Sequence, residues 1–315
     1  VNAPVTVNFT TNITGATFAV PPAQQLFQVH GGFTGSRTRA SGFAPNGSYS
    51  GGAATMTFTP SANFRPGELV SVSVTNASSS VATPNNSVGI RTRPFVFDYR
   101  VAVTSGFGTF ENVQSPPTGT QGFSSCLAHL NGDAFLDLAI TNYGSNNITL
   151  LQGSVSGVFS PMATLASGGI RPSHIVAADF DNDGDMDLAT ANDNNPTNTV
   201  SIYLNNPVGT ITLGSNLASG TGPPRGIIAG DFDGDGDMDV AVTCYVTNNV
   251  RIFLNNGNAT FVQGSLITVG ATPWHITSAD YDGDGDMDLA VTNETSTFVS
   301  LLRNSGYATF IVSSI

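Results

Sequence analysis

Three acidic segments of nearly the same sequence recur in the second half of the chain. They are DFDNDGDMDL at 179–188, DFDGDGDMDV at 231–240 and DYDGDGDMDL at 280–289. Each carries aspartate at alternate positions, and a hard cation such as Ca²⁺ binds six to eight oxygen ligands at about 2.3–2.6 Å. Without a cation, the clustered carboxylates would repel one another. The segments therefore predict three calcium-binding loops.

The spacing within each loop predicts which groups bind the metal. Side chains at positions one, three, five and nine of a tight turn can converge on one point, and position seven can offer its backbone carbonyl. The predicted carboxylate ligands are Asp179, Asp181, Asp183 and Asp187; Asp231, Asp233, Asp235 and Asp239; and Asp280, Asp282, Asp284 and Asp288. The predicted carbonyl ligands are those of Asp185, Asp237 and Asp286.

An EF-hand begins with the same alternation, but it needs an acidic residue at position twelve and a helix on each side. Position twelve is Thr190, Val242 or Val291 here, and the flanking sequences are short and β-rich. A run of acids that forms only a solvated face is the other alternative. Three copies in register with the same glycine argue against it. We therefore expect calcium loops between strands.

A fourth, divergent copy precedes the other three. In HLNGDAFLDL at 129–138, His129 replaces the first aspartate and Ala134 replaces the glycine. The remaining candidates for a ligand set are Asn131, Asp133 and Asp137. We expect this site to bind metal weakly or to be empty.

The net charge of −12 comes almost entirely from these loops. Of 22 acidic residues, 17 lie in the four copies, and the other five face ten arginines, which leaves +5 outside the loops. Three bound Ca²⁺ ions would bring the net charge to about −6. The charge thus indicates a metal rather than a basic partner, and we expect no nucleic-acid partner.

The composition predicts an all-β protein. Lysine is absent, while 35 glycines and abundant Thr, Ser, Asn and Val favour strands and tight turns. No apolar run approaches the roughly 18 residues of a membrane span, and no signal peptide opens the sequence. We expect Val1 to be a mature start or a cloning start.

The loops mark a structural repeat. Their first aspartates lie 52 and then 49 residues apart, and periods in this range are typical of repeat architectures. Each unit predicts an inner strand, the loop, a strand such as DLAVTN, an alternating strand such as NVRIFLNN at 249–256, and an outer strand such as ATFVQGSLI at 259–267. Four antiparallel strands in about 50 residues form a propeller blade.

The loops between short strands, followed by NNGNATF at 255–261, resemble the FG-GAP or VCBS repeat family, which includes the integrin head. The resemblance covers residues 98–315 and implies calcium-bearing β-propeller blades that act outside cells in adhesion or recognition. Residues 98–118 match only half a unit, so about four and a half blades are expected. The ring is then small, or the array is open, or neighbouring chains complete it.

The first 97 residues differ in pattern from the repeats. Alternating segments such as VTVNFT at 5–10 and LVSVSVTN at 69–76 predict a β-sandwich. The segment 58–75, continuing to 93–103, resembles bacterial Ig-like domains. We therefore expect an Ig-like domain at 1–97 and calcium-binding blades at 98–315.

Residues outside the loops offer little sign of catalysis. No nucleophile elbow, zinc-binding helix or phosphate loop is present, so we expect no enzyme activity. His174 and His275 occupy equivalent repeat positions, and Trp274 precedes the second; a packing role is favoured over a groove or a sugar platform. Cys126 and Cys244 are expected to be free thiols.

The favoured function is that of a secreted, calcium-rigidified structural or adhesive protein. Exposed blade or strand edges would allow self-association into an extracellular fibre or layer. The partners expected outside the chain are glycans or cell-surface proteins. A carbohydrate-binding module with pockets between blades is the alternative.

Overall fold

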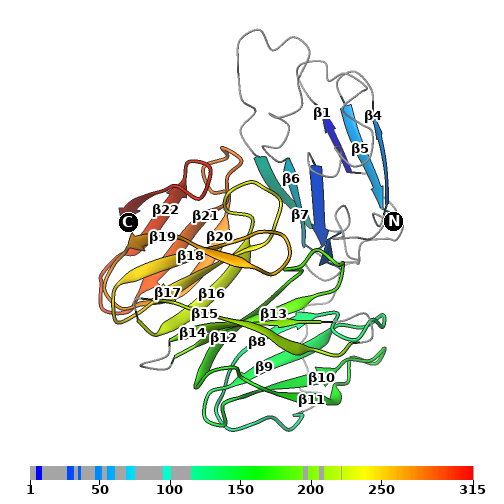
Figure 1. Ribbon diagram of the computed structural model, residues 1–315, viewed down its shortest axis with the longest axis vertical. Coiled ribbons are helices and arrows are strands. Elements are labelled where there is room, and N and C mark those ends of the chain that lie inside the picture. The colour runs from blue at the N-terminus through cyan, green and yellow to red at the C-terminus, as the bar shows by residue number, and fades with distance from the viewer. Residues whose placement is uncertain are drawn as a thin grey trace, which may run out of the picture.

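The computed structural model describes residues 115–193, 198–205, 209–220 and 222–314 in full, and seven strands of the first 100 residues by their backbone. The described residues contain strands and no helix, as expected (Figure 1). No helix among them could span a membrane.

The strands before residue 101 form two antiparallel sheets. One has the order β1-β5-β4 and the other β3-β2-β6-β7. Their bounds are β1 Val5–Asn8, β2 Phe27–Gly31, β3 Gly35–Ser36, β4 Gly47–Gly51, β5 Thr55–Pro60, β6 Leu69–Val74 and β7 Phe95–Arg100. The expected boundary between residues 97 and 98 falls within β7, which pairs with β6. The expected half unit continues into residues 101–114, which lie outside the described residues.

The remaining strands form four antiparallel sheets of four strands each, which we call blades 1 to 4. Blade 1 contains β8 Gly122–Ala128, β9 Asp137–Asn142, β10 Asn147–Gln152 and β11 Ser160–Ala166. Blade 2 contains β12 Pro172–Ala178, β13 Asp187–Asn192, β14 Thr199–Leu204 and β15 Thr212–Ala218. Blade 3 contains β16 Pro224–Gly230, β17 Asp239–Cys244, β18 Asn249–Asn255 and β19 Phe261–Thr268. Blade 4 contains β20 Pro273–Ala279, β21 Asp288–Asn293, β22 Val299–Asn304 and β23 Phe310–Ser314.

The blades follow one another in chain order, from the cyan-green blade 1 to the red blade 4 (Figure 1). The first strands of the four blades, β8, β12, β16 and β20, are in contact successively and form the inner edge of the series. Each acidic loop joins a blade's innermost strand to its second strand. The predicted order of strands within a unit is confirmed.

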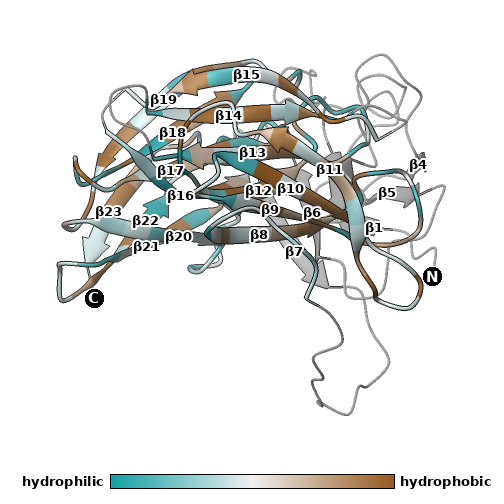
Figure 2. Cartoon of the chain, turned by 90° about the horizontal axis from the view of Figure 1, so that it is seen from below, coloured by the Kyte–Doolittle hydropathy of each residue, from teal (hydrophilic) through white to brown (hydrophobic). Residues whose placement is uncertain are grey.

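Apolar side chains are buried between successive blades. The core between blades 2 and 3 includes Ala189 and Ile202 on one side and Val240 and Phe253 on the other. Equivalent cores lie between blades 1 and 2 and between blades 3 and 4. Hydrophobic residues accordingly line strands such as β10 in Figure 2. Because each blade buries one face against the next, its stability depends on its neighbour.

A second contact, which we call the axial cluster, joins all four blades at the start of their inner strands. The Arg225 guanidinium carbon of blade 3 lies 3.9 Å from the Trp274 ring centre in blade 4 and 5.4 Å from that of Phe123 in blade 1. It also pairs with Asp193 of blade 2. Asp193 further accepts hydrogen bonds from the phenols of Tyr143 and Tyr245, at 3.0 and 3.2 Å.

The axial cluster accounts for the residues whose role the sequence left open. Trp274 stacks with Arg225, and His174 lies edge-on to His275 with 5.4 Å between ring centres. Gly226 occupies the equivalent position in blade 3, where a Cβ atom would lie 2.7 Å from the Trp274 carbonyl oxygen. The geometry is that of packing between blades. Neither Cys126 nor Cys244 forms a disulfide, as expected, and burial raises the pKa of the Cys126 thiol to about 12.

Truncation of a buried side chain between blades should destabilise the repeats. Ile252 is fully buried in the core between blades 3 and 4. We expect Ile252→Ala to cost about 2–5 kcal/mol, because the substitution removes apolar contacts and leaves a cavity. In urea denaturation, the exposed Ile311→Ala control should change stability by about 0.5 kcal/mol or less. Equal effects of the two substitutions would contradict this packing.

Candidate metal centres

In each of the three acidic loops, three carboxylates converge. The groups are Asp179, Asp181 and Asp187; Asp231, Asp233 and Asp239; and Asp280, Asp282 and Asp288. Within each group, one oxygen per side chain lies within 4.8 Å of the others. These are positions one, three and nine of the predicted loops. An all-oxygen set of this kind fits a hard divalent cation such as Ca²⁺.

Backbone N–H groups hold the first and ninth carboxylates in place. In the second loop, Asp231 accepts hydrogen bonds from the N–H groups of Gly234 at 2.8 Å and Gly236 at 3.0 Å. Asp239 accepts them from Phe232 and Asn255, at 2.9 and 2.8 Å. The ninth carboxylate therefore ties the loop both to itself and to the end of the blade's third strand. The other two loops repeat the bonds to the ninth position.

Positions five and seven lie outside the convergent groups. At position five, Asp183, Asp235 and Asp284 each accept a hydrogen bond from the N–H of position seven, at 2.8–3.1 Å. This bond occupies one oxygen of each position-five carboxylate. The second oxygen of that carboxylate remains within the same tight turn. At position seven, the Asp237 side chain is buried and accepts a hydrogen bond from Asn182 at 3.0 Å. Its carboxylate thus serves the structure, and the predicted carbonyl ligation at position seven stays a prediction.

Burial and mutual repulsion raise the pKa values of the convergent carboxylates. Burial and the neighbouring charge of Asp183 raise the pKa of Asp181 to about 6. Burial and Asp235 raise that of Asp233 to about 7. Burial raises the pKa of Asp187 to about 9, against the opposing hydrogen bonds from Asn205 and Phe180. A bound cation would reverse these shifts by favouring the charged carboxylates.

In the divergent loop of blade 1, a side-chain amide bridges the two carboxylates. Asn131, at position three, donates hydrogen bonds to Asp133 at 3.0 Å and to Asp137 at 3.5 Å. Asp133 also accepts one from the Gln152 side chain at 3.0 Å. Burial by itself would raise the pKa of the Asp133 carboxyl group. The hydrogen bonds that this carboxyl accepts outweigh burial, so its pKa lies below the usual value. Within the described ranges, the convergent acidic groups are the three of blades 2 to 4.

The loops of blades 1 to 3 also lie against the turn of the following blade. Asn255 in blade 3 donates a hydrogen bond to the Phe180 carbonyl in the loop of blade 2, at 2.7 Å. Asn304 makes the same contact with Phe232 at 2.7 Å, and Asn205 with Leu130 at 3.0 Å. We call this contact the seam clip. These three loops therefore lie where two blades meet, which the sequence pattern alone did not predict.

These features define a class of all-β repeat proteins with acidic metal loops between blades. The sequence matches the FG-GAP-like repeat family at residues 129–190, 179–242 and 231–291, a little over half of the chain in total. The chain belongs to this family. The match begins at His129, so it includes the divergent loop.

Comparison with solved structures gives distant similarities. A lectin from Agrocybe aegerita that recognises non-reducing terminal N-acetylglucosamine is 20% identical, with a TM-score of 0.43 over 60% of this chain and 50% of the lectin chain. A putative 6-phosphogluconolactonase from Bacteroides uniformis is 16% identical, with a TM-score of 0.45 over 73% and 64%. A protein from Lactobacillus plantarum is 13% identical, with a TM-score of 0.49 over 92% and 66%. The chain therefore spans about half to two thirds of the length of these structures. A comparison with curated proteins finds no match.

Loss of one convergent carboxylate should remove one metal ion. Asp233→Asn keeps the size of the side chain but removes a charge from the group in blade 3. We expect metal analysis and calorimetry to give two Ca²⁺ ions where the native chain binds three. The matched control is Asp133→Asn in the divergent loop, which should leave the calcium count unchanged. A reduced count in the control would contradict the assignment of blade 1.

The raised pKa values predict how calcium stabilisation depends on pH. Carboxyl groups whose folded pKa lies above the unfolded value of about 3.9 stabilise the metal-free protein while protonated, and this contribution is lost as the pH rises through about 6 to 9. Calcium requires the deprotonated forms. The rise in Tm on adding calcium should therefore be larger at about pH 8 than at about pH 5.5. Calorimetric scans with calcium and with a chelator would measure it, and an equal rise at both values would argue against these sites.

Proposed function

We propose that this is a calcium-binding structural or adhesive protein whose blades are made rigid by metal. The single observation that carries this proposal is the position of the acidic loops of blades 2 and 3 at the seams between blades. Asn255 of blade 3, for example, donates a hydrogen bond to the Phe180 carbonyl in the acidic loop of blade 2. A cation that neutralises a loop therefore fixes the surface on which the next blade rests.

We further propose that the protein acts outside the cell and that its N-terminal part is an Ig-like domain. Loops of this kind fill where calcium is abundant, and extracellular modules bind it with Kd values of about 0.1–1 mM. The two sheets before residue 101 are compatible with a sandwich. Adhesion to glycans or cell-surface proteins is the role that a rigid extracellular array would serve.

A non-enzymatic role forms part of the proposal. In the three loops, the carboxylates are bound to backbone N–H groups or grouped with one another. His174 is held by the Arg225 carbonyl, and burial lowers its pKa to about 4. These candidate acids and bases are thus engaged in the fold.

Self-association is supported by the outer face of blade 4. Tyr281 is 46% exposed, whereas its equivalents Phe180 and Phe232 are 0% and 1% exposed beneath the following blades. Ala279, Ala290 and Leu301, which repeat the apolar positions of the cores between blades, also retain some exposure. An apolar face built like the other seams favours contact with a further subunit, and repetition of that contact would give a fibre.

Carbohydrate binding is the second candidate function. It is favoured by a polar pocket of about 580 Å³ between blades 1 and 2, which includes the side chains of Tyr143 and Arg171. An aromatic ring beside amide and guanidinium groups suits a polyhydroxylated ligand. Probing a glycan array with the intact protein would test carbohydrate binding directly.

Removal of calcium should loosen the loops of blades 2 to 4 more than that of blade 1. We expect amide hydrogen exchange at 179–188, 231–240 and 280–289 to accelerate on chelation, because uncompensated carboxylates destabilise those turns. The loop at 129–138 is the internal control, since Asn131 bridges its carboxylates. Equal acceleration in all four loops, or none, would remove the structural role of calcium.

Self-association should depend on the outer face of blade 4. In light scattering with calcium, we expect the native chain to form larger species as concentration rises and Tyr281→Ser to shift the molar mass toward the monomer, because the substitution removes exposed apolar surface. Tyr307→Ser, at a side chain of 50% exposure in the blade 4 turn, is the control. A monomeric native chain at high concentration would end the fibre proposal.

A further inference from the structure

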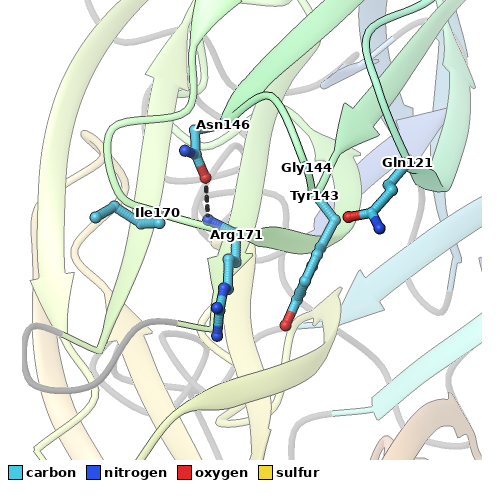
Figure 3. A pocket seen from close by; sticks show the side chains of 6 residues that line it. All are labelled: Gln121, Tyr143, Gly144, Asn146, Ile170 and Arg171. Carbon is cyan, nitrogen blue, oxygen red and sulfur yellow. Dashed lines mark hydrogen bonds between the residues drawn. The ribbon is translucent and has the colours of Figure 1, made fainter.

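A surface pocket lies between the turn that follows β9 in blade 1 and the residues that precede β12 in blade 2 (Figure 3). Its volume is about 580 Å³, and its lining consists of Gln121, Tyr143, Gly144, Asn146, Ile170 and Arg171. It lies at the end of the inner strands opposite the acidic loops. The pocket is therefore separate from the metal centres.

The repeat supplies an internal comparison for this pocket. Between blades 3 and 4 the corresponding turn keeps Tyr245 and Asn248, and the Thr272 N–H bonds to Asn248 as the Arg171 N–H does to Asn146, at 2.9 and 2.8 Å. There, however, Val246 replaces Gly144 and Thr272 replaces Arg171. The frame of the pocket is shared by these two seams, whereas its space and its positive charge distinguish the seam between blades 1 and 2 from that between blades 3 and 4.

Gly144 creates the space. A Cβ atom at this position would lie 2.8 Å from Oε1 of Gln121 and 2.9 Å from Oγ1 of Thr120. Any larger residue would therefore push the Gln121 side chain aside. The Gln121 amide thus remains at the pocket wall, where it can donate and accept hydrogen bonds, and the Asn146 amide, whose oxygen accepts from the Arg171 N–H, offers its NH₂ group as a donor.

Among the fully described residues, no carboxylate forms an ion pair with Arg171. The ion pairs in this part of the chain join Arg225 to Asp193 and Arg303 to Asp282. The Arg171 guanidinium carbon lies 5.7 Å from the Tyr143 ring centre. Tyr143 is fixed in turn by its hydrogen bond to Asp193 and by stacking on Phe123 with 5.5 Å between ring centres. The guanidinium is thus exposed but oriented.

We propose that this pocket binds the acidic residue of a saccharide, a sugar that carries a carboxylate. The planar guanidinium of Arg171 matches a carboxylate in a two-pronged geometry. The Gln121 and Asn146 amides provide the mixed donors and acceptors that hydroxyl groups need. This inference rests on the second candidate function above and names its site and ligand class.

An aspartate-containing peptide could also reach Arg171, but it makes poorer use of the pocket. Its carboxylate would satisfy the guanidinium, whereas the two amides at the wall would have few hydroxyl-like partners. A neutral sugar would use the amides but not the charge. The acidic sugar is the ligand that uses both.

Binding should be measured by calorimetry and saturation-transfer NMR with the full chain in calcium. The probes are N-acetylneuraminic acid, glucuronic acid, N-acetylglucosamine, and a short capped aspartate peptide. We expect at least one acidic sugar to bind about tenfold or more tightly than the neutral sugar and the peptide, because a charge-assisted pair is gained. Arg171→Thr should weaken acidic-sugar binding about tenfold or more, and Gly144→Val should abolish it.

Both substitutions copy residues that the fold already contains in blades 3 and 4. Thr272 has the same left-handed backbone as Arg171, with φ values of 55° and 57°, so Arg171→Thr should fold normally. Thr272→Ala is the matched control and should leave binding unchanged. An unchanged melting temperature in Arg171→Thr would confirm that a loss of binding is local.

The outcomes separate the two levels of the proposal. Equal binding of acidic and neutral sugars, lost in Gly144→Val, would retain carbohydrate binding and overturn the acidic class. Tighter binding of the peptide would overturn the saccharide in favour of a protein partner. Acidic-sugar binding that survives Arg171→Thr would overturn the site. No binding of any probe would overturn the ligand class and the second candidate function together.

Discussion

Close approach of like charges is the constraint on which the repeat depends. In three blades, carboxylate oxygens from three aspartates lie within 4.8 Å of one another at a partly or fully buried turn. Burial makes the charged forms costly, and the raised pKa values of Asp181, Asp187 and Asp233 express that cost. The turns of blades 2 and 3 also receive the seam clip from the next blade. A turn of this kind must therefore both compensate its repelling carboxylates and hold the next blade.

Blade 1 compensates its loop carboxylates in a different way, with a side-chain amide. Asn131 removes one charge from the loop and places amide donors between Asp133 and Asp137. The ninth position keeps its backbone contacts, since Asp137 still accepts from Leu130 and from Gly153. The turn consequently keeps its shape, and the seam clip from Asn205 is retained. A fixed amide network suits a seam that holds regardless of calcium, whereas the proposed metal binding would make the later seams conditional on it.

The sequence predicted what is local and repeated. Strand order, loop position and the divergence at His129 follow from motifs within a single unit, because alternation and turn residues act over a few positions. The convergence of positions one, three and nine, without position five, was not predicted, because it depends on the three-dimensional path of the turn. Local hydrogen bonds do not distinguish the positions, since Asp233 and Asp235 each accept a bond from the N–H two residues further on.

The axial cluster could not be predicted from the sequence, for a different reason. Phe123, Arg225 and Trp274 occupy one equivalent position in three blades, but they differ in type and show no motif. They meet only because the inner strands converge, as the ring contacts of Arg225 show. Gly226 could have provided a signal, since the lack of a side chain there marks a close approach to the next strand. Long-range contacts between dissimilar residues require the arrangement of the blades.

The two ends of the inner strands are therefore suited to different tasks. The seven-residue β12 separates the acidic loop of blade 2 from Arg171 by about 24 Å, beyond the reach of direct contact or unscreened charge. The pocket at Arg171 also spans the seam between blades 1 and 2, where Asn131 takes the place of metal. Two hydrogen bonds hold the pocket, one from the Tyr143 phenol to Asp193 and one from the Arg171 N–H to the Asn146 side chain. The only carboxylate in these two bonds, that of Asp193, is ion-paired with Arg225 and lies outside the acidic loops. The proposed ligand contacts at this end would thus stay in place while the proposed calcium binding sets the rigidity of blades 3 and 4.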